Sequence, residues 1–284
     1  ITEKNPLPFI TGTICAHNCM TKCMRNYYDE PVNIRATKLV AAERGYDDYM
    51  AKIKAPVPVT DGRKVAVIGG GPTGMAAAYF VGRAGIPVTI FERSGVLGGV
   101  VRQVIPAFRI SDDAIDHDVA LMFKMGVEVK LNTEAPSVEE LKAQGYTHIF
   151  FAVGAWKAGK LDIPGNVVPV IGWLKDMKAG KDVSLGHVAV VGGGNTAMDA
   201  ARAALRAGAK SSTLVYRRTK KYMPADAEEL ELAIADGVEF LELVAPVEQK
   251  DGKLVCEKMK LGDPDEKGRR KPVPTGEMVE IPCD

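Results

Sequence analysis

The chain has 284 residues, of which 46% are hydrophobic and 26% charged, and its 37 basic and 36 acidic side chains leave a net charge of +1. This composition is typical of a folded globular protein, and it excludes disordered, collagen-like and strongly basic nucleic-acid-binding sequences. The longest apolar runs are far shorter than the roughly 18 to 20 residues that cross a bilayer. We therefore expect neither a nucleic acid nor a membrane as a partner.

The first residues and the cysteines indicate whether the chain is part of a longer protein and in which cellular compartment it occurs. The sequence starts at Ile1 without an initiator Met or an apolar signal segment, so we expect a piece of a longer protein. Five cysteines form an odd, uneven set, which is typical of a reducing compartment rather than of a disulfide framework. Two of them, Cys256 and Cys283, are isolated and are interpreted as structural. These features predict a cytoplasmic protein.

Three further cysteines lie close together near the N-terminus. Cys15, Cys19 and Cys23 have the spacing C-x3-C-x3-C, which on a helix would place all three sulfurs on one face. Neighbouring thiolates in a reducing compartment are typical of metal or cluster ligands. A [4Fe-4S] cluster takes a fourth ligand, which we expect from an upstream segment or from His17. A zinc site and inert buried cysteines are the alternatives.

The remaining sequence is organised around an internal repeat. A helical pattern over about 34–54 ends at a Pro-containing linker, 55–58. Beyond it, short β-branched strands alternate with Ala-rich helices and glycine turns, first over 64–92 and again over 187–217. The interval between the turn and the glycine that ends the helix is the same in both copies. The repeat predicts an α/β fold with two Rossmann-like dinucleotide-binding units.

Each copy carries a glycine fingerprint where its first strand turns into its helix. The fingerprint positions hold Gly69, Gly71 and Gly74 in the first copy and Gly192, Gly194 and Ala197 in the second. The first position makes a tight turn, the second lets a pyrophosphate approach the backbone, and the third allows close helix packing, where Ala is an accepted substitute. The helices begin at Pro72 and at Asn195 and Thr196, and their N-termini would face the phosphates. This context favours nucleotide sites over plain glycine-rich turns.

The residue that ends the second strand of each copy meets the adenine ribose and so selects the nucleotide. Glu92, followed by Arg93, would accept hydrogen bonds from ribose hydroxyls and repel a 2′-phosphate, which suits FAD or NAD. Arg217 and Arg218 stand at this point in the second copy, with two lysines just beyond. They favour NADP through charge-assisted hydrogen bonds, and a solvated basic loop is the alternative. We predict FAD at the first site and NADP at the second.

Further residues of the first copy are candidates for flavin binding. They are Gly98, Gly99, Val100, Arg109, Ala152 and Gly154. The first three follow the second strand, where a flavin pyrophosphate would pass, and the arginine is either a phosphate partner or structural. The last two lie in a stretch that resembles the A-T-G sequence at the exit of FAD domains. No cysteine lies between Cys23 and Cys256, so electrons from the flavin would leave through the N-terminal cysteines rather than through a dithiol.

These motifs resemble the glutamate synthase small-subunit-like flavoproteins, a family that includes the N-terminal half of dihydropyrimidine dehydrogenase. The likeness covers essentially the whole chain. Besides the fingerprints and cysteines, it rests on Asn5–Pro8, Thr11–Gly12, Ile105–Pro106, Phe108–Arg109, Tyr216–Arg218 and Met223–Ala225. Within the family, Asp29–Arg35 and Leu261–Arg270 are similar above all to the large iron-sulfur subunits named for selenate reduction.

The resemblance implies FAD, NADPH and two [4Fe-4S] clusters, with these cysteines divided between the clusters and completed by an upstream segment. It also implies a Gly-Asp motif that follows the NADP domain and returns to the FAD domain. Neither segment is among the 284 residues. We therefore expect this chain to carry an incomplete cluster and to bind flavin with reduced affinity.

Together these observations predict three domains: a helical iron-sulfur-type segment over 1–60, an incomplete FAD-binding domain over 61–180, and a NAD(P)-binding domain over 181–284. The expected activity is that of an NADPH-dependent flavin and iron-sulfur oxidoreductase module, which passes electrons to a partner electron-transfer or substrate-reducing domain or subunit. The cofactors carry this chemistry, so we predict no catalytic acid, base or nucleophile. A non-catalytic nucleotide-binding scaffold and a standalone NADPH-flavin reductase with a diffusible acceptor are the alternatives.

Overall fold

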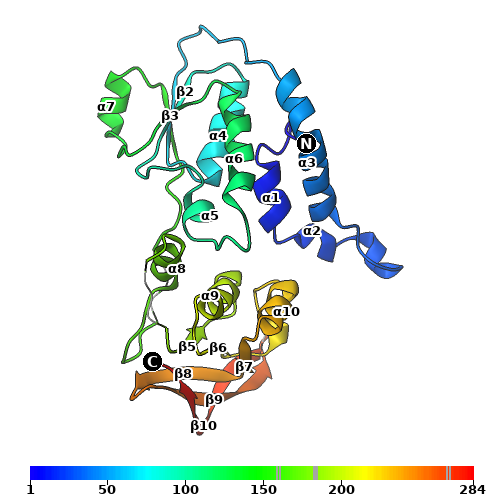
Figure 1. The fold of residues 1–284 in the computed structure, drawn as a ribbon, viewed down its shortest axis with the longest axis vertical. Coiled ribbons are helices and arrows are strands. Elements are labelled where there is room, and N and C mark those ends of the chain that lie inside the picture. Colours follow the sequence, from blue (N-terminus) through cyan, green and yellow to red (C-terminus); the bar gives the residue numbers. More distant parts are fainter. Residues whose placement is uncertain (158, 160, 182–184, 267, 269) are drawn as a thin grey trace. The chain divides into compact units, whose positions relative to one another are not determined.

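The computed structural model describes residues 1–157, 159, 161–181, 185–266, 268 and 270–284. The chain divides into two compact units, Ile1–Trp156 and Lys157–Asp284. Each unit contains one of the two strand-helix-strand copies (Figure 1). Within the described ranges, no helix is long and apolar enough to span a membrane.

A four-stranded parallel sheet in the order β3-β2-β1-β4 forms the centre of the first unit. Its strands are β1 (Val65–Ile68), β2 (Val88–Phe91), β3 (Glu128–Lys130) and β4 (His148–Phe151). The central strands β1 and β2 are buried along their whole length, as their apolar sequences predict for a parallel sheet covered on both faces. Parallel pairing places the carboxyl ends of the strands at one edge, where the glycine turn and Glu92 lie.

Helices flank this sheet and begin at positions that the sequence specifies locally. They are α4 (Pro72–Arg83), α5 (Gly99–Gln103), α6 (Asp112–Phe123) and α7 (Val138–Ala143). The Ser111 side chain caps α6, and Ser137 forms a reciprocal capping box with Glu140 at the start of α7. Pro72 occupies the first turn of α4, where its missing N–H leaves no hydrogen bond unmade.

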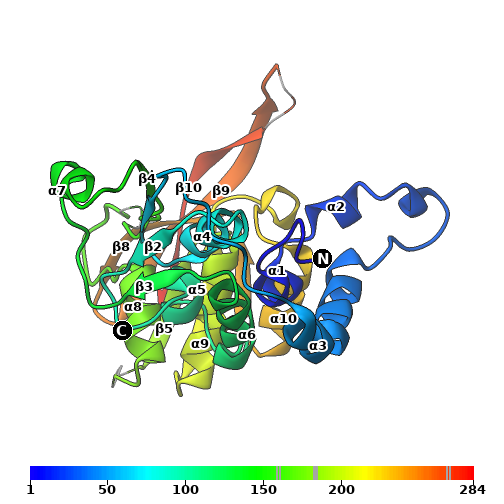
Figure 2. The ribbon, with the colours of Figure 1, turned by 90° about the horizontal axis from the view of Figure 1, so that it is seen from above.

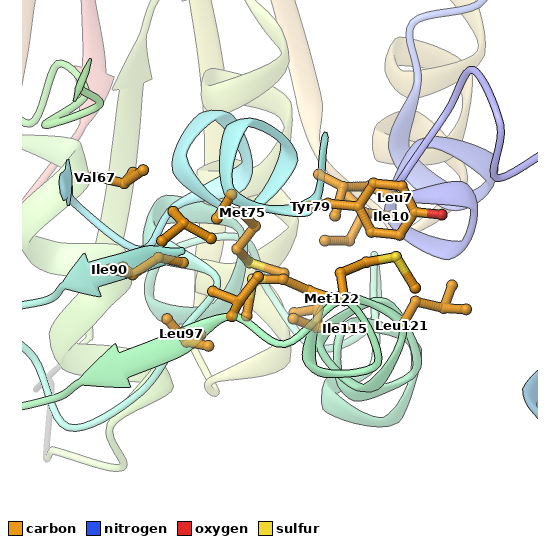
Figure 3. Close-up of a cluster of buried hydrophobic side chains, with 14 of the residues drawn as sticks. Leu7, Ile10, Val67, Met75, Tyr79, Ile90, Leu97, Ile115, Leu121 and Met122 are labelled. Atoms are coloured by element: carbon orange, nitrogen blue, oxygen red, sulfur yellow. The ribbon is translucent and has the colours of Figure 1, made fainter. Parts of the chain in front are cut away.

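The hydrophobic core of the first unit extends into the N-terminal segment. This segment consists of α1 (Pro8–Ile14), α2 (Asn18–Thr21), the 3-10 helix η1 (Met24–Tyr27) and α3 (Ile34–Lys52). Leu7 and Ile10 belong to the same buried cluster as Tyr79 of α4 and Met122 of α6 (Figure 3). The predicted helix from residue 34 is confirmed, and the Asn33 side chain caps it.

A buried carboxylate attaches α1 to α6. Asp118 is fully buried, and its two oxygens accept hydrogen bonds from the backbone N–H groups of Phe9, at 3.1 Å, and Ile10, at 2.8 Å. These N–H groups lie in the first turn of α1, where no intrahelical acceptor is available. The Phe9 ring stacks on His117 with a centroid distance of 4.6 Å, and Tyr46 of α3 packs edge-on against both rings. Two adjacent residues of α6 therefore tie α1 and α3 to the first unit.

The surroundings of Asp118 predict a pH dependence. Burial raises the pKa of this carboxyl from 3.8 to about 7, although the N–H groups of Ile10 and Phe9 act to lower it. Because the folded state binds the proton of Asp118 more tightly than the unfolded state does, protonation of this carboxyl stabilises the fold. The contribution is complete below about pH 4 and is lost as the pH rises through about 7. We expect Asp118→Asn to flatten the pH dependence of the free energy of unfolding in this window, measured by urea denaturation. An unchanged slope would contradict the assigned burial effect.

Replacing Asp118 with Ala tests the attachment itself. The N–H groups of Phe9 and Ile10 would lose their acceptors in a buried position, at a cost of about 1 to 3 kcal/mol for each unsatisfied group. We expect faster hydrogen-deuterium exchange at these two amides, while the amides of β1 keep their protection. Asp113→Ala, on the exposed first turn of α6, is the matched control. Equal protection in the two variants would show that Asp118 does not hold α1.

The second unit contains a parallel and an antiparallel sheet. The parallel sheet has the order β5-β6-β7, with β5 (His187–Val191), β6 (Ser211–Tyr216) and β7 (Glu239–Glu242). The antiparallel sheet has the order β10-β9-β8, with β8 (Val244–Lys250), β9 (Lys253–Pro264) and β10 (Arg270–Pro282). Figure 2 shows β9 and β10 as a long hairpin. The helical elements are α8 (Val170–Lys178), α9 (Asn195–Arg206), η2 (Lys220–Tyr222) and α10 (Ala227–Ala235).

Both strand-helix-strand copies lie at their predicted positions, so the α/β fold with two Rossmann-like units is confirmed. The antiparallel sheet is a feature that the repeat did not predict. It places Cys256 and Cys283 in one hydrophobic cluster with Val215 of β6. Burial raises the pKa of the Cys256 thiol to about 11, so this thiol stays protonated at neutral pH.

Candidate dinucleotide-binding sites

The turn from β1 into α4 leaves no room for a side chain at Gly69 or at Gly74. The Gly69 N–H donates to the carbonyl of Phe91 at 2.9 Å, and Gly69 has a φ of +105°. A Cβ on Gly69 would lie 2.5 Å from the carbonyl oxygen of Ala152, and a Cβ on Gly74 only 1.9 Å from that of Gly69. Glycine is therefore required at both positions by the close packing of β1, β4 and α4.

A second glycine loop lies against this turn. The Gly98 N–H donates to the carbonyl of Gly70 at 2.9 Å. A Cβ on Gly99, whose φ is +54°, would lie 2.8 Å from the Cα of Gly71. The structure thus brings together the two loops that the sequence singled out, with Val100 in the first turn of α5. The result is a surface of backbone at the N-terminus of α4, which suits the approach of a dinucleotide phosphate.

Glu92 is held at the carboxyl end of β2 by the same turn. Its side chain is buried, and Oε2 accepts a hydrogen bond from the Gly70 N–H at 2.6 Å while Oε1 accepts one from the Ser94 N–H at 2.8 Å. Each carboxylate oxygen has a second lone pair for another donor. The carboxylate is therefore fixed beside the fingerprint, with capacity left for ribose hydroxyls.

The other candidates of the first unit take separate positions. Ala152 lies beside the fingerprint, since its N–H donates to the carbonyl of Ile68 at 2.8 Å. Gly154 is exposed with a φ of +70°. Arg93 is exposed, with its guanidinium 5.7 Å from the centroid of the Trp156 ring. Arg109 is half-buried in the loop before α6.

The second fingerprint repeats this geometry with more space. The Gly192 N–H donates to the carbonyl of Val215 at 3.1 Å, and a Cβ on Gly194, the N-cap of α9, would meet nothing within 4 Å. The Ala197 Cβ lies 3.3 Å from where a Cβ on Gly192 would stand. Alanine occupies this third position, whereas its counterpart in the first unit, Gly74, must be glycine. Thr196 follows in the first turn of α9.

Two arginines follow β6 without carboxylate partners among the described residues. Arg217 is exposed and Arg218 is half-buried. The Arg218 Nε is buried and has no hydrogen-bond partner, and neither arginine forms an ion pair in the part of the chain that the structure describes. A phosphate monoester offers the oxygens that such donors lack. The residues present therefore fit a 2′-phosphate.

The three N-terminal cysteines do not lie on one helix, so that expectation is wrong. Cys15 ends α1 in an extended conformation, Cys19 lies in α2, and Cys23 precedes η1, again extended. The helical path is broken at His17, whose φ is +38°. Among the described residues, no three ligand atoms from these cysteines and His17 lie within 4.8 Å of one another.

Cys23 nevertheless has a feature of a ligand thiolate. Backbone N–H groups of Val32 and Arg25 donate hydrogen bonds to its sulfur and lower the pKa of the thiol. The thiolate is the form that binds metal. Cys15 and Cys19 are exposed, so their sulfurs are accessible to a metal ion or cluster.

Sequence reasoning missed two residues that shape these sites. The Ser94 N–H orients Glu92, and the Tyr216 hydroxyl donates to the carbonyl of Tyr222 at 2.7 Å, within the loop that follows Arg217. Ser94 belongs to no recognised motif, whereas Tyr216 opens the stretch Tyr216–Arg218 of the family resemblance without having been predicted to shape a site. Besides that stretch, a hydroxyl-bearing aromatic at the end of a buried strand was a signal that could have identified the role of Tyr216.

Two Rossmann-like units, each built on a parallel sheet with a glycine turn at a helix N-terminus, define the class of two-nucleotide oxidoreductases. The chain belongs to the pyridine nucleotide-disulphide oxidoreductase family, which matches residues 63–276. This family is flavin- and NAD(P)-dependent, so the chain is an oxidoreductase module of a type that binds FAD and NAD(P).

Several named proteins are similar in sequence to this chain. YgfK of Escherichia coli (strain K12) is 45% identical across the whole chain, which covers 28% of that protein. The NADPH-Fe(3+) oxidoreductase subunit beta of Geobacter sulfurreducens is 38% identical, again across the whole chain and over 45% of that protein. The glutamate synthase [NADPH] small chain of Escherichia coli (strain K12) is 31% identical over 99% of this chain and 65% of its own length. The resemblance to glutamate synthase small chains is confirmed, and the chain spans less than half of the first two relatives.

Solved structures share the fold. The 6-hydroxypseudooxynicotine amine oxidase HisD of Pseudomonas geniculata N1 matches with a TM-score of 0.62 at 20% identity, over 97% of this chain and 40% of that one. A 2-naphthoyl-CoA reductase matches with a TM-score of 0.60 at 23% identity, over 80% and 33% of the two chains.

Two positions of the fingerprints, Gly74 and Gly194, are predicted to differ in their tolerance to a methyl group. We expect Gly74→Ala to destabilise the protein by about 1 to 3 kcal/mol or more, because its Cβ would overlap the Gly69 carbonyl. Gly194→Ala adds the same methyl group in open space and is the matched control, with an expected change below about 1 kcal/mol. Thermal and urea unfolding of both variants measure the difference. Equal losses would mean that the packing around Gly74 relaxes.

Proposed function

We propose that this chain is an NADPH-dependent FAD and iron-sulfur oxidoreductase module that passes electrons to a partner domain or subunit. The observation that carries the proposal is the opposite charge at equivalent positions of the two units. Glu92 ends β2 in the first, while Arg217 and Arg218 follow β6 in the second. The names of two relatives, which specify NADPH, support the same preference.

In this proposal the FAD-binding domain covers 61–180 and the NAD(P)-binding domain covers 181–284, with the cysteine segment over 1–60. Bound FAD and NADP(H) supply hydride transfer, which a side chain cannot perform. The chain's own residues bind and orient. The N-termini of α4 and α9 hold phosphates, and Glu92 holds the ribose of FAD.

The N-terminal segment would supply ligands for iron-sulfur clusters that accept electrons from the flavin. Cys15, Cys19 and Cys23 are the proposed ligands of [4Fe-4S] clusters. The lowered pKa of Cys23 supports this role. The attachment of α1 to α6 supports it as well, because Cys15 directly follows α1. Relatives named as beta subunits or small chains support the presence of a partner subunit.

The preference for NADPH can be tested at the two arginines. We expect Arg217→Ala with Arg218→Ala to weaken NADPH binding selectively, since each charge-assisted hydrogen bond contributes roughly 1.5 to 3 kcal/mol. NADH, which has no 2′-phosphate, should be affected little. Titration of each coenzyme against the purified chain measures both affinities.

A charge-matched variant controls for long-range electrostatics. Lys210→Ala with Lys253→Ala removes two exposed cations from the amino ends of β6 and β9, away from the carboxyl end that carries the arginines. This variant should retain the preference for NADPH. Equal losses of NADPH and NADH affinity in the arginine variant would refute the assignment.

The flavin assignment can be tested at Glu92. We expect Glu92→Arg to weaken FAD retention, because the ribose contact is lost and the Gly70 N–H loses its acceptor. Glu92→Gln keeps an acceptor oxygen and should retain more flavin than the arginine variant. FAD per folded chain after purification and NADPH affinity are the measurements. Full flavin content in Glu92→Arg would show that the site is misplaced.

A further inference from the structure

The loop 217–226, here called the basic loop, joins β6 to α10 and is bonded to the second fingerprint. The Ala225 N–H donates to the carbonyl of Gly193 at 3.0 Å. The Asp226 N–H donates to the Asn195 side-chain oxygen at 2.9 Å. The fingerprint and the basic loop are therefore one connected structure, although about thirty positions separate them in the sequence.

The Tyr216 side chain contacts both the basic loop and the second fingerprint. Its hydroxyl donates to the carbonyl of Tyr222 at 2.7 Å. Its ring lies under the fingerprint, where a Cβ on Gly193 would stand 2.5 Å from a ring carbon. The side chain is buried, so it cannot move aside without opening the end of β6. The ring of Tyr216 therefore requires glycine at position 193.

Two further hydrogen bonds fix the backbone of the loop at Arg218 and Lys220. The Lys220 N–H donates to Glu242 Oε2 at 2.7 Å, and the carbonyl of Arg218 accepts from the Leu243 N–H at 3.1 Å. These anchors use backbone groups of the loop, while the guanidinium groups form no ion pair within the described ranges. The backbone of the loop is therefore held in place while its two guanidinium groups stay available to a ligand, whereas the Lys220 ammonium lies 3.9 Å from the Glu231 carboxylate.

This arrangement lowers the cost of binding a phosphate. Ordering a flexible residue costs backbone entropy, and a loop already held in its bound conformation avoids that loss when the ligand arrives. The benefit applies only to ligand groups that contact the loop. It therefore acts on a 2′-phosphate and not on the phosphates at the N-terminus of α9.

We propose that Tyr216 and Asn195 are positioning residues that hold the basic loop ready for the 2′-phosphate and so set the preference for NADP(H) over NAD(H). This inference rests on the proposed NADP site. Both residues act through the loop: Tyr216 through the carbonyl of Tyr222, and Asn195 through the N–H of Asp226.

Adenosine 2′,5′-bisphosphate and 5′-AMP are suitable probes, because they differ only in the 2′-phosphate and need no turnover. Their affinities for the full 284-residue chain are measured by titration calorimetry. We expect Tyr216→Phe to reduce the ratio of the two affinities about 3- to 10-fold, the effect of losing one hydrogen bond. Asn195→Ala should reduce the ratio similarly, and Asn195→Asp, which keeps an acceptor oxygen, should restore it.

Thr213→Val is the matched control for Tyr216→Phe. It removes a hydroxyl on the same strand, which donates to Glu239 Oε2 of β7 at 3.2 Å rather than to a group of the basic loop. The control should lose stability without changing the affinity ratio. If Thr213→Val lowers the ratio as much as Tyr216→Phe does, general loosening of β6 explains the effect and the inference is overturned.

The failure of this inference differs from the failure of the proposed site. If the unmodified chain binds both probes equally, the NADP site is wrong and the role of the loop falls with it. If the chain prefers the bisphosphate, and Arg217→Ala with Arg218→Ala abolishes that preference, the site stands. In that case an unchanged ratio of the two probe affinities in Tyr216→Phe and Asn195→Ala overturns the positioning role but leaves the NADP site standing.

Discussion

The structure depends on the close approach of backbone to backbone where β1 turns into α4. Gly69 and Gly74 lie so near the chain at β4 and at the turn itself that a single methyl group would overlap a carbonyl oxygen. This contact fixes the N-terminus of α4 at the carboxyl edge of the sheet. It also leaves the Gly70 N–H directed at Glu92. The selective carboxylate and the phosphate-facing helix end are consequences of the same turn.

The two units share this backbone design but differ in how their charges are satisfied. In the first unit, each carboxylate oxygen of Glu92 already accepts one hydrogen bond, from the N–H group of Gly70 or of Ser94. In the second, the Arg218 Nε is buried without a partner in the described part of the chain, and the fingerprint bonds instead to the basic loop through Asn195. One site therefore presents an acceptor and the other presents donors, which is the physical basis for proposing FAD in one and NADP in the other.

The N-terminal segment is part of the first unit rather than a loose extension of it. Asp118 bonds the first turn of α1, and the Phe9–His117–Tyr46 contacts join α1 to α3. Cys15 ends the helix that is held in this way. Any cluster bound by these cysteines would thus be attached to the nucleotide-binding core through α6. This rigidity suits electron transfer, in which the distance between redox centres must be maintained.

The sequence by itself determined the two strand-helix-strand copies, the glycine positions and the opposite charges at Glu92 and Arg217, because these are local patterns set by hydrophobic spacing and backbone sterics. It could not determine that the cysteines occupy three separate elements, since the spacing C-x3-C-x3-C fits a helix equally well. Nor could it reveal the bonds from Asp118 to Phe9 and from Asn195 to Asp226, which join residues 109 and 31 positions apart. Such pairs carry no local pattern, because only chain folding brings a buried acceptor to its donor.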